Sequence, residues 1–229
     1  MGLGCKTMKI AAVVGLMTGA LAAPGWADFD LQITEIWPGN EPGANLSEDW
    51  FEVTNFGDMA WTAAVNGDLY FDDESFDETT ADLMSGVDSI APGESVIFVN
   101  GGEDGAAEWI ALWSPDITLP QVGSYNGAGL SQGGDAVGLF LDIDANGPDA
   151  DELFETQAYP DANLAAGGSY DVLLGQFSTV GNAAGAVATT TLNDVNQPVV
   201  GSPGSIVPEP TTAGLIIVAS GLLALRRHA

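Results

Sequence analysis

Oxygen-bearing side chains alternate along one short segment of the chain, LDIDANGPDADE, which begins at residue 141. The candidate ligands in it are Asp142, Asp144, Asn146, Asp149 and Asp151. Hard cations such as Ca²⁺ prefer carboxylate and amide oxygens, and a glycine permits the sharp turn that brings alternate ligands around one ion. These residues therefore predict a Ca²⁺ site, and Ca²⁺ is the one cofactor that the sequence suggests.

The same segment has a simpler alternative. An EF-type loop would place a bidentate glutamate where Leu153 stands, and the later aspartates are displaced by one position. A hairpin turn at Asn146 and Gly147, with solvated acids around it, explains the segment without a metal. The spacing favours this turn, and the Ca²⁺ site stays open beside it.

A second acidic stretch, FDDESFDETTAD over 71–82, crowds several carboxylates together. They are Asp72, Asp73, Glu74, Asp77 and Glu78. Like charges at this density would gain from a divalent ion. Such a run is more often a solvated, mobile loop, and we expect a loop here.

Catalytic side chains are scarce in this chain. Residues 28–207 contain no Lys, Arg or His, and the only cysteine is Cys5. Nucleophilic triads, Schiff-base chemistry and a histidine-rich zinc site are therefore excluded there. Two carboxylates could hydrolyse a glycoside, and Glu35, Glu52 and Glu108 remain candidates for that role. The first two lie in alternating segments whose polar residues we expect to face outward, so the sequence predicts a protein that is not an enzyme.

Net charge limits which partners can bind. The chain carries a formal charge of −28, and 31 of its 32 acids lie between residues 28 and 207 with no basic side chain among them. Nucleic acid is excluded as a direct partner, because counterion release requires Lys and Arg. Repulsion among the carboxylates should oppose folding at low ionic strength, and salt or divalent cations should relieve it.

The segments that must position these residues have the patterns of short β-strands. Apolar and polar residues alternate over 31–36 and 50–55, and a continuous apolar run begins at Val96. AVGLFLDI from Ala136 and LFETQAY from Leu153 form a pair joined by a polar turn. About seven to nine such strands predict an all-β fold, specifically an immunoglobulin-like antiparallel β-sandwich.

Five tryptophans remain after residue 27. Large aromatic side chains dominate the energetics of a protein core, and we expect Trp50 and Trp113 there. Trp37 and Trp61 stay open between the core and a surface platform on which sugars could stack.

The N-terminus has the three parts of a signal peptide. Lysines precede an apolar stretch over 10–22, and small residues stand at the two positions that signal peptidase recognises. We predict that signal peptidase removes residues 1–27, with the cut after Ala27 or, as the alternative, after Ala23, and that Cys5 leaves with the peptide. The protein would then be exported across the inner membrane.

The C-terminus carries Val207-Pro208-Glu209-Pro210, an apolar stretch, and then Arg226 and Arg227. The apolar stretch predicts a transmembrane helix over about 211–225, which is short for the roughly 30 Å hydrocarbon core of a bilayer. The arginines should stay on the cytoplasmic side by the positive-inside rule. Residues 198–206, which are poor in charge and rich in Gly and Pro, predict a linker to this helix.

This C-terminal arrangement resembles the PEP-CTERM sorting signal of Gram-negative bacteria, with motif, helix and basic end in the same order. The resemblance implies a sorting signal over 207–229 and an exosortase, an integral-membrane transpeptidase, that acts near the Pro-Glu-Pro element. It also implies a transient anchor in the inner membrane, followed by delivery to the cell surface or an extracellular matrix.

Residues 28–206 resemble a lamin-tail domain over their length, and we assign the domain itself to residues 28–197. The succession LQITEIWP, EDWFEVTNFGD, IAPGESVIFVNG and GLSQGGDAVGLFLD, closed by SPGS, follows the order of strands and turns in that family. The resemblance implies an immunoglobulin-like sandwich that serves as a binding or interaction module and carries no reaction of its own.

Together these patterns predict a non-enzymatic surface or matrix protein with a structural, adhesive or binding role. The alternative is a Ca²⁺-dependent carbohydrate-binding module, which would have the same fold and would need the metal to bind its ligand. Extracellular polysaccharide is the partner that either role suggests.

Overall fold

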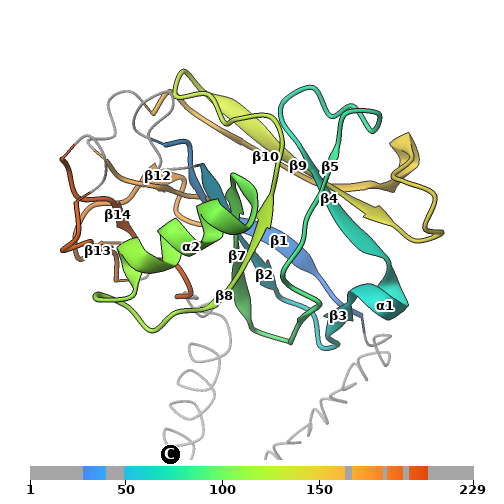
Figure 1. Ribbon diagram of the computed structural model, residues 1–229, viewed down its shortest axis with the longest axis horizontal. Coiled ribbons are helices and arrows are strands. Elements are labelled where there is room, and N and C mark those ends of the chain that lie inside the picture. The colour runs from blue at the N-terminus through green and yellow to red at the C-terminus, as the bar shows by residue number, and fades with distance from the viewer. Residues whose placement is uncertain (1–27, 40–48, 163–166, 183–184, 193–195, 206–229) are drawn as a thin grey trace, which may run out of the picture.

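A computed structural model of the chain describes residues 28–39, 49–162, 167–182, 185–192 and 196–205. Strands make up most of the regular structure, in several sheets with few helices (Figure 1). The all-β class predicted from the sequence is therefore confirmed. No helix within these ranges is long and apolar enough to cross a membrane.

Both predicted targeting segments lie outside the described residues. One is the signal peptide of residues 1–27, with its cut after Ala27. The other is the sorting segment of residues 207–229, which includes the predicted transmembrane helix. Both segments stay predictions.

The larger sheet has six strands. In spatial order they are β12 (Gln176–Phe177), β11 (Tyr170–Asp171), β1 (Leu31–Trp37), β2 (Trp50–Asn55), β7 (Ser95–Asn100) and β8 (Gln121–Tyr125). β8 runs parallel to β7, whereas the other neighbours are antiparallel. Helix α2 (Gly102–Trp113) crosses over between β7 and β8, as parallel pairing requires. The prediction of purely antiparallel strands is therefore wrong at this pair.

The second sheet has four antiparallel strands. In spatial order they are β10 (Leu153–Tyr159), β9 (Asp135–Asp142), β4 (Asp68–Asp72) and β5 (Asp82–Leu83). The smaller elements are β3 (Trp61–Thr62) paired with β6 (Ser89–Ile90), β13 (Val187–Ala188) paired with β14 (Val200–Gly201), helix α1 (Ala63–Asn66) and the 3₁₀ helix η2 (Ala150–Glu152). The predicted pair of strands joined by a polar turn is confirmed as β9 and β10.

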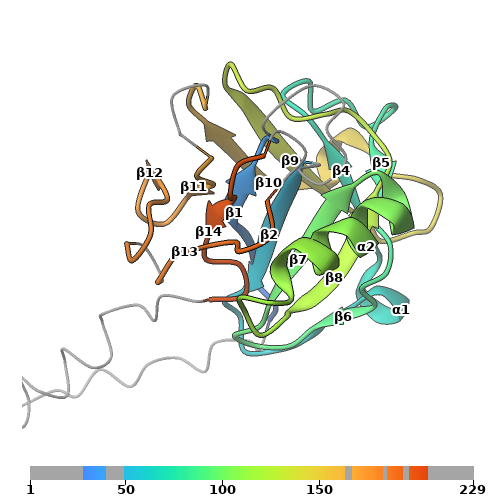
Figure 2. The same cartoon turned by 60° about the vertical axis from the view of Figure 1, so that its left-hand side comes forward.

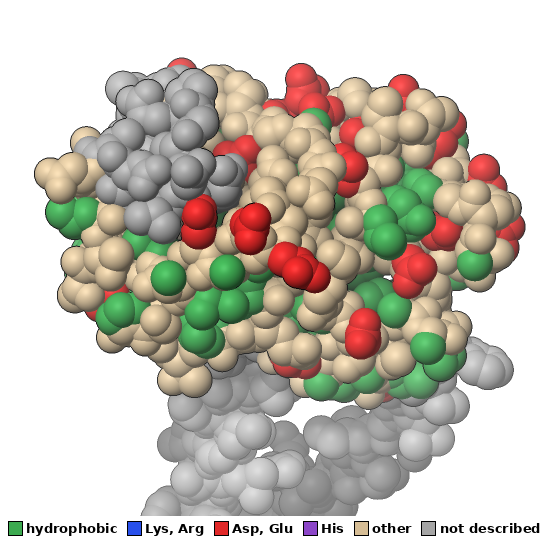
Figure 3. Space-filling view, viewed as in Figure 1, with side chains coloured by type: hydrophobic (Ala, Val, Ile, Leu, Met, Phe, Trp, Pro, Cys, Tyr) green, Lys and Arg blue, Asp and Glu red, His purple; other side chains and the backbone are tan. Residues whose placement is uncertain are grey.

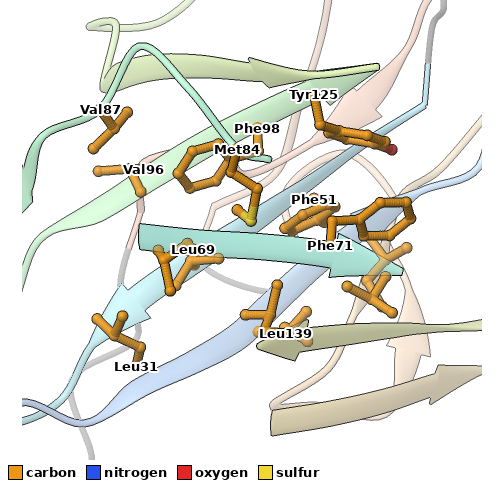
Figure 4. Packing of buried hydrophobic residues seen from close by; sticks show 14 of the residues in the cluster. Leu31, Phe51, Leu69, Phe71, Met84, Val87, Val96, Phe98, Tyr125 and Leu139 are labelled. Carbon is orange, nitrogen blue, oxygen red and sulfur yellow. The ribbon is translucent and has the colours of Figure 1, made fainter. Parts of the chain in front are cut away.

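Apolar side chains from the two large sheets meet in a shared core (Figure 4). Phe51 of β2 stacks on Phe71 of β4, with ring centroids 5.4 Å apart and ring planes at 25°. Tyr125 of β8 lies against Phe71 at a centroid distance of 4.3 Å. Because side chains alternate along a strand, each sheet turns one apolar face to the other. Burial of this aromatic surface stabilises their packing.

Helix α2 covers the opposite face of the six-stranded sheet (Figure 2). It begins after Gly101, whose φ of 91° is a left-handed conformation that glycine adopts without strain. Trp109 and Trp113 lie four residues apart on one face of the helix. Both meet Trp50 of β2 edge-on, with centroids 6.0 and 6.2 Å away. This contact fixes the helix on the sheet.

All five described tryptophans are buried, with at most 3% of their surface exposed. The core position predicted for Trp50 and Trp113 is confirmed. Trp37 and Trp61, which the sequence leaves open, are core residues too. None of these side chains can therefore form a sugar-stacking platform on the surface.

Residues 199–205, which we call the C-terminal strap, lie against the domain, whereas the sequence predicts a linker over 198–206. Val199 is fully buried. The carbonyl of Val199 accepts from Thr189 N at 2.9 Å, and Val200 N donates to the carbonyl of Gly167 at 2.8 Å. Backbone groups make these contacts, so the composition of the strap does not reveal them.

Candidate functional site

The predicted Ca²⁺ segment forms the connection from β9 to β10. Asp142, the last residue of β9, is 3% exposed. Its Oδ1 accepts from Ala145 N at 2.8 Å, and its Oδ2 accepts from Gly147 N at 2.9 Å. Gly147 has a φ of 98°, which is the positive-φ turn that the hairpin alternative predicts. Asp142 therefore shapes this turn through backbone hydrogen bonds.

Glu152 reaches back to the start of the same connection. It forms a capping box with Asp149, in which Asp149 N donates to Glu152 Oε2 at 2.9 Å. Its Oε1 accepts from Ile143 N at 3.1 Å. One carboxylate oxygen each from Asp142, Asp144 and Glu152 then lie within 4.8 Å of one another. This spacing allows the three carboxylates to ligate one cation such as Ca²⁺.

Two of the five predicted ligands belong to this group of three carboxylates, and three do not. Asn146 instead donates from Nδ2 to Asp144 Oδ2 at 2.8 Å. Asp149 caps η2, and Asp151 is exposed. Desolvation and the neighbouring Glu152 carboxylate raise the pKa of Asp149. The alternate spacing of ligands did not predict Glu152 as a ligand. The D-x-x-E pattern of a capping box, from Asp149 to Glu152, indicates its position in the sequence.

The second acidic stretch is organised around one buried carboxylate, Asp72. Its Oδ2 accepts from Ser75 Oγ at 2.6 Å and from Asp77 N at 2.7 Å. Thr80 Oγ1 donates to its Oδ1 at 3.3 Å. Local turns account for this stretch, and within the described residues its acids form no group of three possible metal ligands.

A separate acidic site lies on the six-stranded sheet, where Glu35 of β1 stands opposite Glu52 of β2. Both side chains are 2% exposed. A register shift between Ile33 and Glu35 turns Glu35 to the face that Glu52 occupies. The prediction that these glutamates face outward to solvent is wrong. Alternation identifies the face, but α2 and the strap cover that face as well.

Backbone N–H groups and hydroxyls surround this buried glutamate pair. The donors are Ser202 N and Ser169 Oγ to Glu35, and Gly204 N and Thr34 Oγ1 to Glu52. Ser202 N lies 2.9 Å from Glu35 Oε1, and Gly204 N lies 2.6 Å from Glu52 Oε2. No cation is among these partners, because residues 28–205 contain no Lys, Arg or His.

Burial raises the pKa of both carboxyl groups. Desolvation and the adjacent Glu52 carboxylate raise the pKa of Glu35 to about 8. Desolvation raises the pKa of Glu52 to about 7, against the opposing effect of hydrogen bonds from Thr34 and Gly204. Asp171, opposite Glu35 on β11, is also buried, and desolvation raises its pKa. The pair can therefore hold protons near neutral pH.

The surface acids differ from this pair because water solvates them. Figure 3 shows acidic side chains scattered over one face of the domain, with no basic side chain to offset them. The strap separates Glu35 and Glu52 from the surrounding water. A substrate could reach these two glutamates only by displacing the strap. Glu108, the third carboxylate that the sequence leaves open for catalysis, lies on α2.

No protein-family model matches the chain, and no curated protein or solved structure matches it. The structure is that of an acidic all-β protein with a candidate cation site and a buried glutamate pair. The PEP-CTERM and lamin-tail resemblances stay predictions.

Proposed function

We propose that the chain is a non-enzymatic exported protein of the cell surface or extracellular matrix, with a structural, adhesive or binding role. The placement of charge carries this proposal. All four Lys and Arg residues flank the two apolar end segments, and the domain between them contains none. Basic residues next to an apolar segment are typical of targeting segments.

The proposed route uses both ends of the chain. Signal peptidase removes residues 1–27 during export. The C-terminal apolar segment holds the protein in the inner membrane, with Arg226 and Arg227 on the cytoplasmic side. An exosortase-type transpeptidase then acts near Pro208-Glu209-Pro210, as in PEP-CTERM proteins. The domain passes to the surface or matrix, where extracellular polysaccharide is the proposed partner.

The domain in this proposal is an immunoglobulin-like β-sandwich of the lamin-tail kind. Two observations support this description. The six-stranded and four-stranded sheets share one core. The segments LQITEIW and WFEVTN, which carry the resemblance, are neighbouring antiparallel strands in the larger sheet. Such a sandwich presents loops to partners and needs no catalytic group.

Sorting can be tested in a Gram-negative host that carries an exosortase. We expect the wild-type chain to reach the matrix fraction. Replacing Arg226 and Arg227 by alanine, or Glu209 by alanine, should reduce that fraction by roughly tenfold, because the membrane stop or the processing motif is lost. Asp88→Ala, which removes an exposed acid of the domain, serves as the control and should sort normally. Equal sorting of all these variants would contradict the proposal.

A Ca²⁺-dependent carbohydrate-binding module is the second candidate function, and the proximity of Asp142, Asp144 and Glu152 favours it. It predicts that millimolar Ca²⁺ raises the midpoint of thermal unfolding more than Na⁺ at matched ionic strength. Asp144→Asn should cancel this rise, because it removes one of the three carboxylate ligands, while the backbone hydrogen bonds to Asp142 and Glu152 that shape the turn remain. Asp151→Asn, outside the group, is the control. An equal response to both salts would mean charge screening alone.

A further inference from the structure

The last residues of the strap lie directly on the buried glutamate pair. A Cβ added at Gly201 would stand 2.8 Å from Glu35 Oε1 and 3.3 Å from Trp113 Cη2. Three residues further on, the backbone has reached Glu52, since Gly204 N donates to that carboxylate. The strap backbone therefore seals the pair from water, and its own N–H groups depend on the two carboxyl groups as acceptors.

Only acids and uncharged groups face the pair. Glu35 and Glu52 face each other across β1 and β2, and Asp171 faces Glu35 from β11. Ser95 of β7 is a hydrogen-bond partner of Glu52. The strap and the nearby face of α2 contribute no titratable side chain, because Ser202, Gly204 and Trp113 are their contacts. Two ionised glutamates would have no compensating cation in this site.

We propose that residues 202–205 are a pH-sensitive latch, which docks on Glu35 and Glu52 while at least one of these carboxyl groups is protonated and detaches when both are ionised. Gly201 and the residues before it stay in place, because β14 pairs with β13 independently of the glutamates. Detachment admits water to both carboxylates and removes the cost of burying two like charges.

Proton linkage determines how docking of the latch depends on pH. With the latch docked, desolvation favours the protonated carboxyl groups; with it detached, hydration returns both groups toward their ordinary pKa values. The docked form therefore binds more protons than the detached form. Low pH favours docking, and the latch opens as pH rises through the interval in which the docked pair ionises, about 7 to 8.

The latch sets where the chain leaves the domain. Detaching four residues adds roughly 13 Å of extended chain between the domain and whatever follows residue 205. If the proposed sorting function holds, that length lies between the domain and the membrane segment and gives a transpeptidase access to its motif. This consequence rests on the proposed function, whereas the latch itself does not.

Hydrogen exchange of the full chain, purified in a neutral detergent and followed by mass spectrometry, tests the latch directly. After correction for base-catalysed intrinsic exchange, protection of the segment 202–205 should fall more than about tenfold between about pH 5.5 and pH 9. Protection of β2 and β7 in the same samples should change much less. Protection of 202–205 that stays constant over this range would overturn the proposal, whatever the sorting experiments show.

Variants distinguish the effect of ionising Glu35 and Glu52 from the effect of general repulsion among the surface carboxylates. Glu52→Gln should keep 202–205 protected at high pH, because a neutral amide oxygen still accepts from Gly204 N. Asp88→Asn, which removes one exposed charge, should leave the wild-type loss intact. Gly201→Ala should lower protection at every pH, because its Cβ would contact Glu35 and Trp113. The same pH-dependent loss in Glu52→Gln as in the wild type would also overturn the latch.

Discussion

Replacing Glu35 and Glu52 together by glutamine should make the protein more stable than the wild type at about pH 9, by on the order of 3 kcal/mol or more. Both glutamates have pKa values of about 8 and about 7 in the folded protein, against an ordinary value of 4.5. Between about pH 4.5 and pH 8, the folded protein therefore binds more protons than the unfolded chain. The stability that this difference provides is full below about pH 4.5 and is lost as pH rises through 7 and 8. Glutamine is neutral throughout and removes the loss.

Urea unfolding at a series of pH values measures this effect. The wild type should lose stability from about pH 5 to pH 9, and the double glutamine variant should lose much less. Asp88→Asn combined with Asp151→Asn is the matched control, because it removes two exposed carboxylates and changes the net charge equally. This control should follow the wild-type profile. Parallel profiles for all three proteins would show that the buried pair does not control the pH dependence.

Trp113→Ala should cost about 3–5 kcal/mol of unfolding free energy, since it opens a cavity where α2 meets the sheet. Trp113 is fully buried, meets Trp50 edge-on at 6.2 Å, and packs against Trp109 at 5.8 Å. It also lies against the strap at Gly201. Loss of this ring would therefore loosen α2 and the strap together, and the crossover between β7 and β8 would lose its main anchor.

Ile110→Ala on the same helix is the control for this substitution. Ile110 is 37% exposed, so truncation there should cost less than about 1 kcal/mol. Both variants are compared with the wild type by urea unfolding at a pH near 5, where the glutamate pair is protonated. A Trp113→Ala variant as stable as Ile110→Ala would mean that α2 contributes little to the fold.

Period-two alternation predicted β1 and β2 of the larger sheet, a continuous apolar run predicted β7, and a pair of apolar segments around a polar turn predicted β9 and β10. WFEVTN is β2 with the same bounds, and LFETQAY is β10. Alternation worked because Phe51 and Val53 face one side and Trp50 and Glu52 face the other. It does not show whether the second side is covered. The burial of Glu52 depends on α2 and on the strap, and both are distant from it in sequence.

GAAEWIALW, residues 105–113, predicts one or two helical turns, but the full length of α2 and the docking of the strap could not be predicted, for different physical reasons. The α2 sequence contains Gly102 and Gly105, which lower helix propensity, and its stability comes from tryptophan packing on the sheet. The strap is held through backbone bonds such as that of Ser202 N to Glu35. Backbone bonds of this kind leave no periodic pattern in the side chains of the strap.

The candidate cation site was predicted in part. Alternate spacing identified Asp142 and Asp144, because both lie at the start of one turn. Glu152 enters the site through the η2 capping box, which folds the far end of the connection back toward Ile143. Alternate spacing predicts ligands correctly only in one continuous loop. This connection contains the short helix η2, so the spacing did not identify Glu152.

The intact mass of the protein from the matrix of an exosortase-carrying host shows whether the exported chain is processed at both ends. We predict a chain that begins at Asp28 and ends near Pro208-Glu209-Pro210, without Arg226 and Arg227. The same host without its exosortase should retain the full C-terminus in the inner membrane. Matrix protein that still begins at Met1 or still carries the terminal arginines would contradict processing at both ends.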